Sequence, residues 1–304
     1  IVDEYINCEE VGISKEDSTL VVKPNKKSLY LGGAGIVASH CANLGSKVDL
    51  YSFASNDNTY KFISNKLDEY SVNNNIHFCN MKSTIKKTRF KKDNKILFRV
   101  NDINQYAIPN SLENKILKSL ESKKDYYNLI IFSDFNYGCL PKKIINKILR
   151  IFKNSNIIKA GDSQSSSHTG DIKKFKNLDL VTATEYELRL NLNDFSNNIT
   201  YLANKYINNY QCRNLIIKLG KNGIFIHSST NLNNTISDSV RGLNSFPKNI
   251  SGAGDSFLVF SSLALASKAN IWEASTLGSL GAALHISKEG NIPINYEEFN
   301  NLLH

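Results

Sequence analysis

The sequence has few features of a metalloprotein, a disulfide-linked protein or a membrane protein. Its five cysteines lie at least thirty residues apart, with no Cys-x-x-Cys or Cys/His pairing, so neither a zinc site nor a disulfide framework is predicted. No apolar stretch approaches the ~20 residues of a membrane span, and no charged leader followed by an apolar run is recognised. We therefore expect a cytoplasmic protein that does not bind a membrane.

Two further binding classes are disfavoured. The chain lacks the Gly-x-x-x-x-Gly-Lys-Ser/Thr pattern of P-loop nucleotide-binding proteins. The net charge of +9 could indicate a nucleic-acid partner, but the lysines form short scattered clusters such as Lys26-Lys27 and Lys173-Lys174, and no RNA-binding aromatic motif accompanies them. We expect no nucleic-acid partner, and a basic surface would equally suit phosphate-bearing ligands.

Length and composition suit one α/β domain. The chain has 304 residues, and hydrophobic residues at 41% can supply a buried sheet. Strand-like and helix-like segments alternate, a pattern typical of a mostly parallel sheet with helices on both faces. Strand patterns span residues 47–51, 129–132 and 178–181, and a helix pattern spans residues 59–70. Two hairpins of short strands are also predicted, one within residues 19–30 and one within residues 85–100.

The most informative segment is a glycine-rich turn, Ser-Gly-Ala-Gly-Asp-Ser-Phe at residues 251–257, which opens an apolar helix. Glycines let the backbone approach a ligand closely, and the free N–H groups of a first helical turn favour an anion. Asp255 places a carboxylate inside this phosphate-holding turn, where it can serve as a base. The alternative is an ordinary N-terminal helix cap, with the glycines serving packing.

A second glycine-rich turn, Leu-Gly-Gly-Ala-Gly-Ile-Val-Ala at residues 31–38, lies more than two hundred residues upstream. Residues 33–38 fit the Gly-x-Gly-x-x-Gly/Ala dinucleotide fingerprint, and Asp57 follows about twenty residues later. Nicotinamide binding is therefore an alternative interpretation. It leaves the Asp255 turn unexplained.

The two turns, in this order and at this separation, resemble the two signatures of the PfkB/ribokinase family of sugar kinases. Within that family, residues 84–89 (TIKKTR), 133–138 (SDFNYG) and 182–187 (TATEYE) resemble segments of the heptose 7-phosphate kinase domain of ADP-heptose synthase. The resemblance extends over nearly the whole chain. It implies a ribokinase-like, mostly parallel central sheet flanked by helices, with small β-lid strands at about residues 14–31 and 84–101.

The resemblance also bears on domain organisation. In the family a first core strand precedes the segment that Asp3-Glu4-Tyr5 resembles, whereas only two residues precede Asp3 here. A single kinase domain over residues 1–304 is implied, with its first core strand missing at the N-terminus.

The family's catalytic residues can be placed on this sequence. The resemblance implies that Asp255 deprotonates the acceptor hydroxyl, and that Gly252, Ala253 and Gly254 form an anion hole for the transferred phosphate. The implied substrate-binding residues are Asp3, Gly32, Gly33, Lys87, Arg89 and Asp134. Among these, Lys87 and Arg89 would hold the acceptor's own phosphate, since guanidinium donors fit phosphate oxygens; the alternative for that pair is a solvated basic strand.

ATP and Mg²⁺ are the implied cofactors. Lys218, Gly220 and Gly223 lie in a predicted strand pair that resembles the nucleotide-contacting element of the family, although glycines are common in any hairpin turn. Glu187 would help to order Mg²⁺ through water. Its alternative is a solvated helix residue.

We expect a carbohydrate kinase that transfers the γ-phosphate of ATP to a sugar or sugar phosphate, with a heptose 7-phosphate-like acceptor favoured. The resemblance to the family also implies a homodimer that pairs through the lid strands, and a fused or partner nucleotidyltransferase domain. Ile36, Tyr137 and Asn249 depart from the family's pattern and favour an alternative, a non-catalytic sugar-phosphate-binding module beside a nucleotidyltransferase. The intact Asp255 turn favours the kinase.

Overall fold

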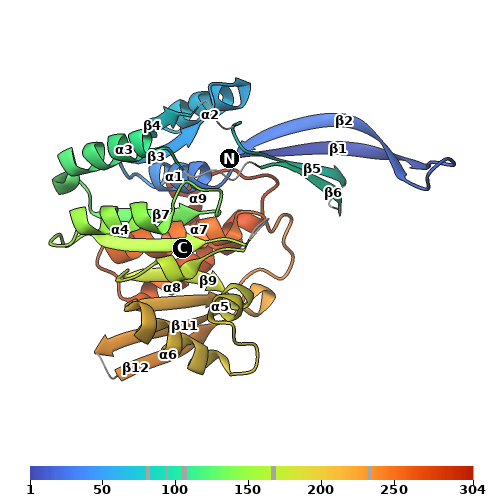
Figure 1. The fold of residues 1–304 in the computed structure, drawn as a ribbon. Helices are drawn as coiled ribbons and strands as arrows, with labels where there is room; N and C mark the ends of the chain where they lie inside the picture. The colour runs from blue at the N-terminus through green and yellow to red at the C-terminus, as the bar shows by residue number, and fades with distance from the viewer. Residues whose placement is uncertain (80–82, 94, 104–107, 166–168, 232–233, 304) are drawn as a thin grey trace.

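The protein consists of an α/β body from which a β lid projects (Figure 1). The computed structural model describes residues 1–79, 83–93, 95–103, 108–165, 169–231 and 234–303. Helices cover both faces of the sheet in the body. The ribokinase-like α/β class expected from the sequence is confirmed.

The largest sheet has six strands in the order β12-β11-β10-β9-β8-β7. Its four strands from β7 to β10 are parallel, whereas β11 and β12 are antiparallel additions at one edge. The strands are β7 (Leu129–Asp134), β8 (Ile158–Ser163), β9 (Leu180–Thr184), β10 (Asn214–Lys218), β11 (Ile224–Asn231) and β12 (Asn234–Val240). The strands expected at 129–132 and 178–181 are confirmed as β7 and β9, and the predicted strand pair around Lys218 and Gly223 is confirmed as β10 and β11.

Alternate residues of these strands enter two apolar clusters on opposite faces of the sheet. Val181 and Leu215 pack with α3 to α6, whereas Leu180 and Ile216 pack with α7 and α8. Because both faces are covered, the parallel strands are apolar throughout rather than alternating with polar residues. The covering helices are α3 (Asn110–Ser122), α4 (Lys142–Ile151), α5 (Glu185–Leu192), α6 (Ile199–Tyr210), α7 (Ala253–Ala266) and α8 (Ile271–Ile286).

A separate pair of parallel strands lies beside the main sheet. It comprises β3 (Asp49–Ala54) and β4 (Asn73–Phe78), connected by α2 (Asn58–Glu69). The helix expected at 59–70 is confirmed. Helix α1 (Ala34–Asn43) packs against α7, and α9 (Tyr296–Leu303) ends the described chain.

The lid is a four-stranded sheet in the order β2-β1-β5-β6. Its strands are β1 (Val2–Ile13), β2 (Leu20–Leu31), β5 (Lys86–Lys92) and β6 (Lys95–Asp102). β1 and β2 form a long antiparallel hairpin, while β5 pairs in parallel with β1 and antiparallel with β6. The hairpin expected within residues 85–100 is confirmed.

The hairpin expected within residues 19–30 is wrong, because that segment forms the single strand β2. Its partner is β1, twelve residues from Val2 that the sequence analysis did not identify as a lid strand. Pro24 pairs with Cys8 beside a register shift at Asn7/Cys8 that accommodates it. The lid therefore includes residues 2–13 in addition to the predicted range.

Candidate active site

The Asp255 turn opens α7, and its conformation depends on glycine. Gly252 precedes the helix with φ 81°, ψ −2°, in the left-handed region. A Cβ at this residue would lie 2.5 Å from His285 Nε2 and 2.4 Å from Asn291 Oδ1. The same ring nitrogen of His285 lies 3.1 Å from the carbonyl oxygen of Ser251. Side chains behind the turn therefore fix the backbone N–H groups that open the helix, as an anion site requires.

Asp255 lies in the first turn of α7 and is buried. Its Oδ1 accepts a hydrogen bond of 2.7 Å from Gln164 Nε2, which follows β8. Burial raises the pKa of Asp255 to about 7; the charge of Asp162 adds to the rise, and Lys218 opposes it. A carboxylate with a pKa near neutrality is suited to accept a proton from a hydroxyl.

We expect kcat/KM to rise with pH and to level off above about pH 7, because the raised pKa of Asp255 keeps its carboxyl protonated, and unable to accept a proton, at lower pH. The measurement is the pH dependence of kcat/KM between pH 5.5 and 9, which reports ionisation in the free enzyme. A flat profile from pH 6 to 8 would contradict the role of this carboxyl.

Lys218 at the end of β10 extends toward the turn. Its Nζ forms an ion pair with Oδ2 of the buried Asp162 and lies 3.2 Å from the position a Cβ of Gly254 would occupy. Although burial would lower the pKa of Lys218, the carboxylates of Asp162 and Glu187 raise it above its ordinary value. A positive charge is therefore held beside the N–H groups of the α7 turn.

The lid contributes further charged side chains to the site, all from one face of its sheet. Asp3 pairs in register with Lys87 and Tyr5 with Arg89, and residues two apart on a strand share a face. Arg89 donates a hydrogen bond of 2.6 Å to Asp3 Oδ1, and its guanidinium lies 5.0 Å from the centre of the Tyr5 ring. Within the described chain, the buried Nε of Arg89 has no hydrogen-bond partner.

Lys87 is buried, with its Nζ over two aromatic rings, 4.8 Å from the centre of Phe135 and 5.2 Å from that of Tyr137. Both Lys87 and Asp3 act electrostatically on Asp255. The predicted base, Lys87 and the Asp3–Arg89 pair thus belong to one cluster, to which the lid and the body both contribute. Tyr137, at the position where the family's pattern has a lysine, is part of the support for Lys87.

The glycines of the first turn pack closely against the same cluster. A Cβ on Gly32 would lie 2.5 Å from Asp3 Oδ2, and one on Gly33, whose φ is 58°, would lie 3.0 Å from Phe135. These two positions leave no room for a side chain. Asp134, also predicted to bind the substrate, has other contacts. Its buried carboxylate pairs with Lys174 and accepts a 2.8 Å hydrogen bond from Ser163 Oγ.

Glu187 is buried rather than solvated. It forms a capping box with Thr184 at the start of α5, in which Glu187 Oε2 accepts a 2.7 Å hydrogen bond from the Thr184 N–H. Its Oε1 accepts a 2.7 Å bond from the Ser165 N–H, on the loop that carries Gln164. Glu187 therefore orders the loop beside Asp255.

The two predicted nucleotide glycines follow Lys218 in the turn between β10 and β11. Gly223 has φ 93°, and a Cβ there would lie 2.0 Å from the Val240 carbonyl oxygen. Close packing against the end of β12 therefore explains why this residue is a glycine. Gly220 also has a positive φ, 60°, but no atom lies within 4 Å of its Cβ position.

The sequence analysis did not assign four residues that hold this cluster together: Asp162, Gln164, His285 and Asn291. Asp162 and Gln164 lie in a run that begins at Gly161 and leads into three serines. This run is unusual in composition, but nothing in the sequence indicated what its residues do. Ser166 and Ser167 lie outside the described residues. Asn291 donates to Asp3 Oδ2 at 3.3 Å and to the Leu31 carbonyl at 2.8 Å. It follows α8 with no local motif, and only the fold brings it to Asp3.

Among the described residues, no group of three His, Cys, Asp or Glu side chains could hold a metal ion. None of the five cysteines forms a disulfide within the described residues. None of the helices in the described ranges is long and apolar enough to cross a membrane.

Solved structures with the same fold are sugar kinases. Phosphofructokinase-2 from Escherichia coli superimposes with a TM-score of 0.78 at 14% identity, covering 99% of this chain and 94% of that one. Ribokinase from Thermotoga maritima gives a TM-score of 0.74 at 18% identity, covering 99% and 96%. At these identities the likeness establishes the fold.

Sequence comparison gives the class and then the family. The matching curated relatives include the bifunctional protein HldE of Campylobacter jejuni, 26% identical over 309 residues, and that of Koribacter versatilis, 26% identical over 309 residues. The matches cover 98% and 100% of this chain but 62% and 61% of those proteins. The chain thus falls in the class of carbohydrate kinases, which is what the matching family model describes. It belongs to the pfkB family of carbohydrate kinases, which its sequence matches over residues 5–297.

Proposed function

We propose that this kinase phosphorylates a sugar that already carries a phosphate, with a heptose 7-phosphate-like acceptor favoured, and that Asp255 is its catalytic base. The observation that carries the proposal is the convergence of a buried carboxylate, a helix N-terminus and two basic lid residues in one cluster. The relatives named HldE support the choice of acceptor, because the resemblance extends over nearly the whole chain.

Arg89 and Lys87 support the phosphorylated acceptor in particular. Asp3 accepts a hydrogen bond from Nη1 of Arg89, whereas the buried Nε of Arg89 has no hydrogen-bond partner in the described part of the chain. Leaving a buried donor without a partner is costly, and a phosphate oxygen would satisfy it. Lys87 adds a positive charge held by the Phe135 and Tyr137 rings.

The transfer step assigns each group a task. Asp255 accepts the proton of the attacking hydroxyl, whose oxygen forms the new bond to the γ-phosphorus of ATP while the bond to the ADP oxygen breaks. The N–H groups of Gly252, Ala253 and Gly254, together with Lys218, stabilise the negative charge on the transferring phosphoryl group. Gln164 orients the Asp255 carboxylate through its 2.7 Å hydrogen bond.

Asp162 and Glu187 are the residues that fit a Mg²⁺ site. Asp162 Oδ1 is buried and has no hydrogen-bond partner within the described residues, and Mg²⁺ prefers carboxylate and water oxygens. Mg²⁺ bound with ATP would neutralise charge on the β- and γ-phosphates. Because both Glu187 oxygens already accept backbone hydrogen bonds, its contact would run through water.

The test is coupled ADP release by the purified chain with heptose, hexose and pentose phosphates and with the free sugars. We expect one phosphorylated acceptor to exceed its free sugar in kcat/KM by at least about tenfold, and Arg89→Gln to remove that preference because it removes a charge-assisted contact. Equal turnover of free and phosphorylated sugars would contradict the acceptor assignment. If a folded protein released no ADP with any of these acceptors but still bound a sugar phosphate, the result would favour the non-catalytic sugar-phosphate-binding module.

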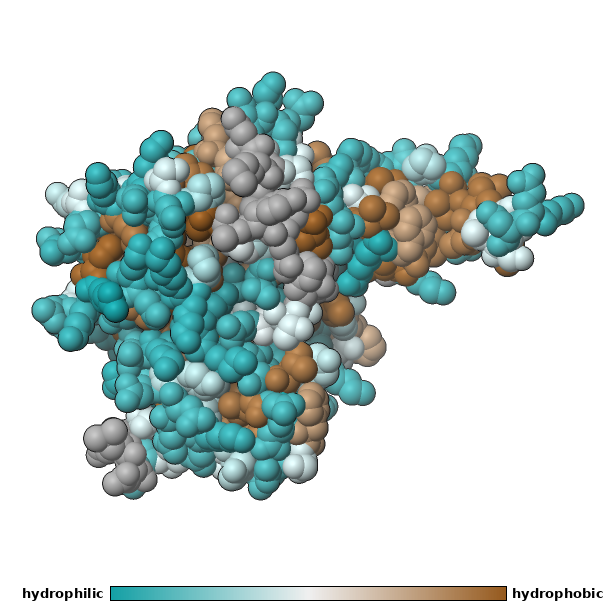
Figure 2. Space-filling view, viewed as in Figure 1, coloured by the Kyte–Doolittle hydropathy of each residue, from teal (hydrophilic) through white to brown (hydrophobic). Residues whose placement is uncertain are grey.

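We also propose that the protein pairs through its lid. The β6 residues Phe98 and Val100 pair in register with Phe90 and Thr88, so they lie on the lid face opposite Lys87 and Arg89. Both are exposed, and Figure 2 shows hydrophobic residues along the projecting lid. Val11 and Ile13 near the tip of the lid are exposed as well, and exposed apolar side chains gathered on one element are typical of an interface. By the HldE likeness, a nucleotidyltransferase domain is a further proposed partner, and an ATP-dependent enzyme of this kind would act in the cytoplasm.

Sedimentation velocity tests the lid interface. We expect a dimer at micromolar concentration, and a monomer for Val100→Asp, because a carboxylate would be buried without a partner at the interface. Ile236→Asp, at an exposed apolar position on β12, is the matched control and should leave the dimer intact. A monomeric wild type, or a dimer that Val100→Asp does not weaken, would contradict the proposal.

A further inference from the structure

The segment between α8 and α9, residues 287–295, lies where the lid joins the body, and we call it the bridge. Its residue Asn291 is buried. Asn291 Nδ2 donates hydrogen bonds to Asp3 Oδ2 at 3.3 Å and to the Leu31 carbonyl oxygen at 2.8 Å. Asp3 lies near the start of β1 and Leu31 ends β2. One amide therefore holds both strands of the long lid hairpin at their base (Figure 1).

The oxygen of the same amide faces the phosphate turn. A Cβ on Gly252 would lie 2.4 Å from Asn291 Oδ1, so Oδ1 fills the place that a side chain of Gly252 would take. Gly252 directly precedes α7 and belongs to the predicted anion hole. Asn291 is thus in contact both with Asp3, a predicted acceptor-binding residue, and with the turn that carries Asp255.

The two residues before Asn291 also contact the lid. Glu289 Oε1 lies 3.3 Å from Lys91 Nζ of β5. A Cβ on Gly290, whose φ is 80°, would lie 2.4 Å from the Tyr30 ring of β2. With Asn291, the bridge therefore contacts three of the four lid strands.

The body holds the bridge at both of its ends. The Ile294 N–H donates a 3.1 Å hydrogen bond to Nδ1 of His40 in α1. At the other end, the Lys248 N–H, four residues before Gly252, donates a 2.8 Å hydrogen bond to the carbonyl oxygen of Ile286, the last residue of α8. The bridge is therefore fixed to the body while its middle holds the lid.

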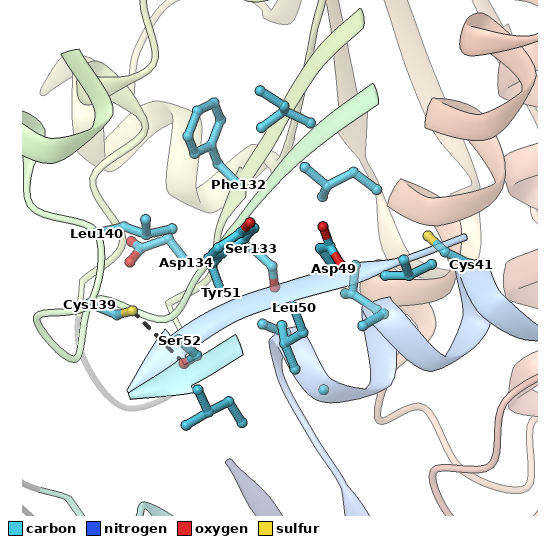
Figure 3. A pocket seen from close by; sticks show the side chains of 18 of the residues that line it. Cys41, Asp49, Leu50, Tyr51, Ser52, Phe132, Ser133, Asp134, Cys139 and Leu140 are labelled. Atoms are coloured by element: carbon cyan, nitrogen blue, oxygen red, sulfur yellow. Dashed lines mark hydrogen bonds between the residues drawn. The ribbon is translucent and has the colours of Figure 1, made fainter. Parts of the chain in front are cut away.

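The contacts of Asn291 are separate from the cavity of about 660 Å³ that residues of β3 and β7 line (Figure 3). Leu31 is among the residues that line this cavity, whereas Asp3, Gly252 and Asn291 are not. A substitution at Asn291 therefore replaces no residue of the cavity wall, and its effects report on the contacts with the lid and the phosphate turn.

We propose that Asn291 is a positioning residue that holds the acceptor-binding base of the lid at a fixed distance from the phosphate turn. The inference rests on the proposed function, in which Asp3 contacts the acceptor and Gly252 the transferring phosphate. The reacting atoms must approach to about 3–3.5 Å, and a displacement of about 1 Å can cost about 10²-fold in rate. Without the Asn291 amide, Asp3 and the turn can shift independently of each other.

The kinetic test uses the acceptor with the highest turnover in the ADP-release assay. We expect Asn291→Ala to lower kcat at least about tenfold and to change KM for ATP by less than about threefold, because the proposed nucleotide contacts come from β10 and the turn that follows it. Asn291→Ser, a milder change whose side chain is too short to reach both partners, should show the same pattern. Wild-type kcat in both variants would contradict the proposal.

Asn295→Ala is the matched control within the bridge. Asn295 is exposed, and its Oδ1 accepts a 2.8 Å hydrogen bond from the Glu298 N–H at the start of α9. The substitution removes a helix-capping bond and some stability, but none of the contacts with the lid or the phosphate turn. We expect its kcat to equal that of the wild type.

A double-mutant cycle separates positioning from a loss of stability. If Asn291 acts through Asp3, Asn291→Ala should cost at least about tenfold in kcat/KM in the wild type but less than about threefold in an Asp3→Ala background, because the effects of residues in contact are not additive. Losses that multiply in the double variant would mean that the two residues act independently, and would overturn the proposal.

Amide hydrogen exchange gives a readout that needs no turnover. Asn291→Ala should speed exchange at least about tenfold in two segments far apart in the sequence, residues 3–5 and 252–256, whereas Asn295→Ala should affect α9 alone. Faster exchange in only one of the two segments, or in neither, would overturn the proposal. If both segments respond and no acceptor is phosphorylated, the positioning role stands and the proposed function fails, so the two failures are distinguishable.

Discussion

Replacing Asp255 with asparagine should lower phosphoryl transfer by about 10²–10⁴-fold, the usual contribution of a positioned general base. Asparagine has nearly the same shape and can keep a hydrogen bond with Gln164, but its amide cannot accept the hydroxyl proton. The N–H groups of the turn remain, so nucleotide affinity should change by less than about threefold. Turnover and ATP affinity by calorimetry are the measurements. Asp238→Asn, at an exposed carboxylate on β12, is the control, and unchanged turnover in Asp255→Asn would contradict its role as base.

The same substitution should stabilise the protein at neutral and alkaline pH. Because the pKa of Asp255 is raised by folding, the folded state holds its proton more tightly than the unfolded state does. The contribution of Asp255 to the free energy of unfolding therefore falls as the pH rises from about 4, the ordinary pKa of an aspartate, through about 7, its pKa in the folded protein. At pH 8, Asp255→Asn should raise the free energy of unfolding by up to about 4 kcal/mol, and near pH 4 the two proteins should unfold alike. Equal stability at both pH values would contradict the raised pKa.

Lys218→Met should impair both stability and catalysis. It removes one partner of a buried ion pair and leaves the Asp162 carboxylate without its cation, a change that typically costs about 3–5 kcal/mol of folding free energy. It also removes the positive charge beside the α7 turn, where loss of a single stabilising donor can cost about 10²–10³-fold in kcat. Chemical unfolding and steady-state kinetics are the measurements.

A second substitution separates the two effects of Lys218. In Lys218→Met/Asp162→Asn, the unpaired carboxylate is gone, so much of the stability should return while kcat stays well below that of Asp162→Asn alone, the reference that accounts for the proposed Mg²⁺ contact of Asp162. Lys221→Met, an exposed lysine three residues later, should alter neither property. If the double variant regained wild-type turnover, Lys218 would be a structural residue with no part in phosphoryl transfer.

Local chemistry was the reliable part of the sequence analysis. The Asp255 turn could be predicted because glycines, a carboxylate and a following apolar helix are contiguous. The hairpin within residues 85–100, which contains β5, was equally clear, and in the structure the alternation along β5 puts Lys87 and Arg89 on one face. These inferences need only neighbours in sequence, and the structure places all of them in one cluster.

Long-range pairing was the part that the sequence did not disclose. Strand β1 was not predicted, because Asn7, Glu9 and Glu10 give it little apolar character; its partners in the lid are β2 and β5. Asn291 reaches Asp3 across 288 positions of sequence. Likewise, Glu187 suggested a metal ligand by resemblance, whereas its observed hydrogen bonds cap α5 and hold the Ser165 loop. Such roles depend on which elements the fold brings together.

The central claim is that the Asp255 cluster transfers phosphate from ATP to a sugar phosphate, and the most direct measurement is ³¹P NMR of the product formed from ATP and a heptose 7-phosphate. We predict ADP and a bisphosphorylated sugar with one new phosphate ester in wild type, and neither in Asp255→Asn. ATP hydrolysis to free phosphate without a new sugar ester, or the same product from Asp255→Asn, would contradict the account.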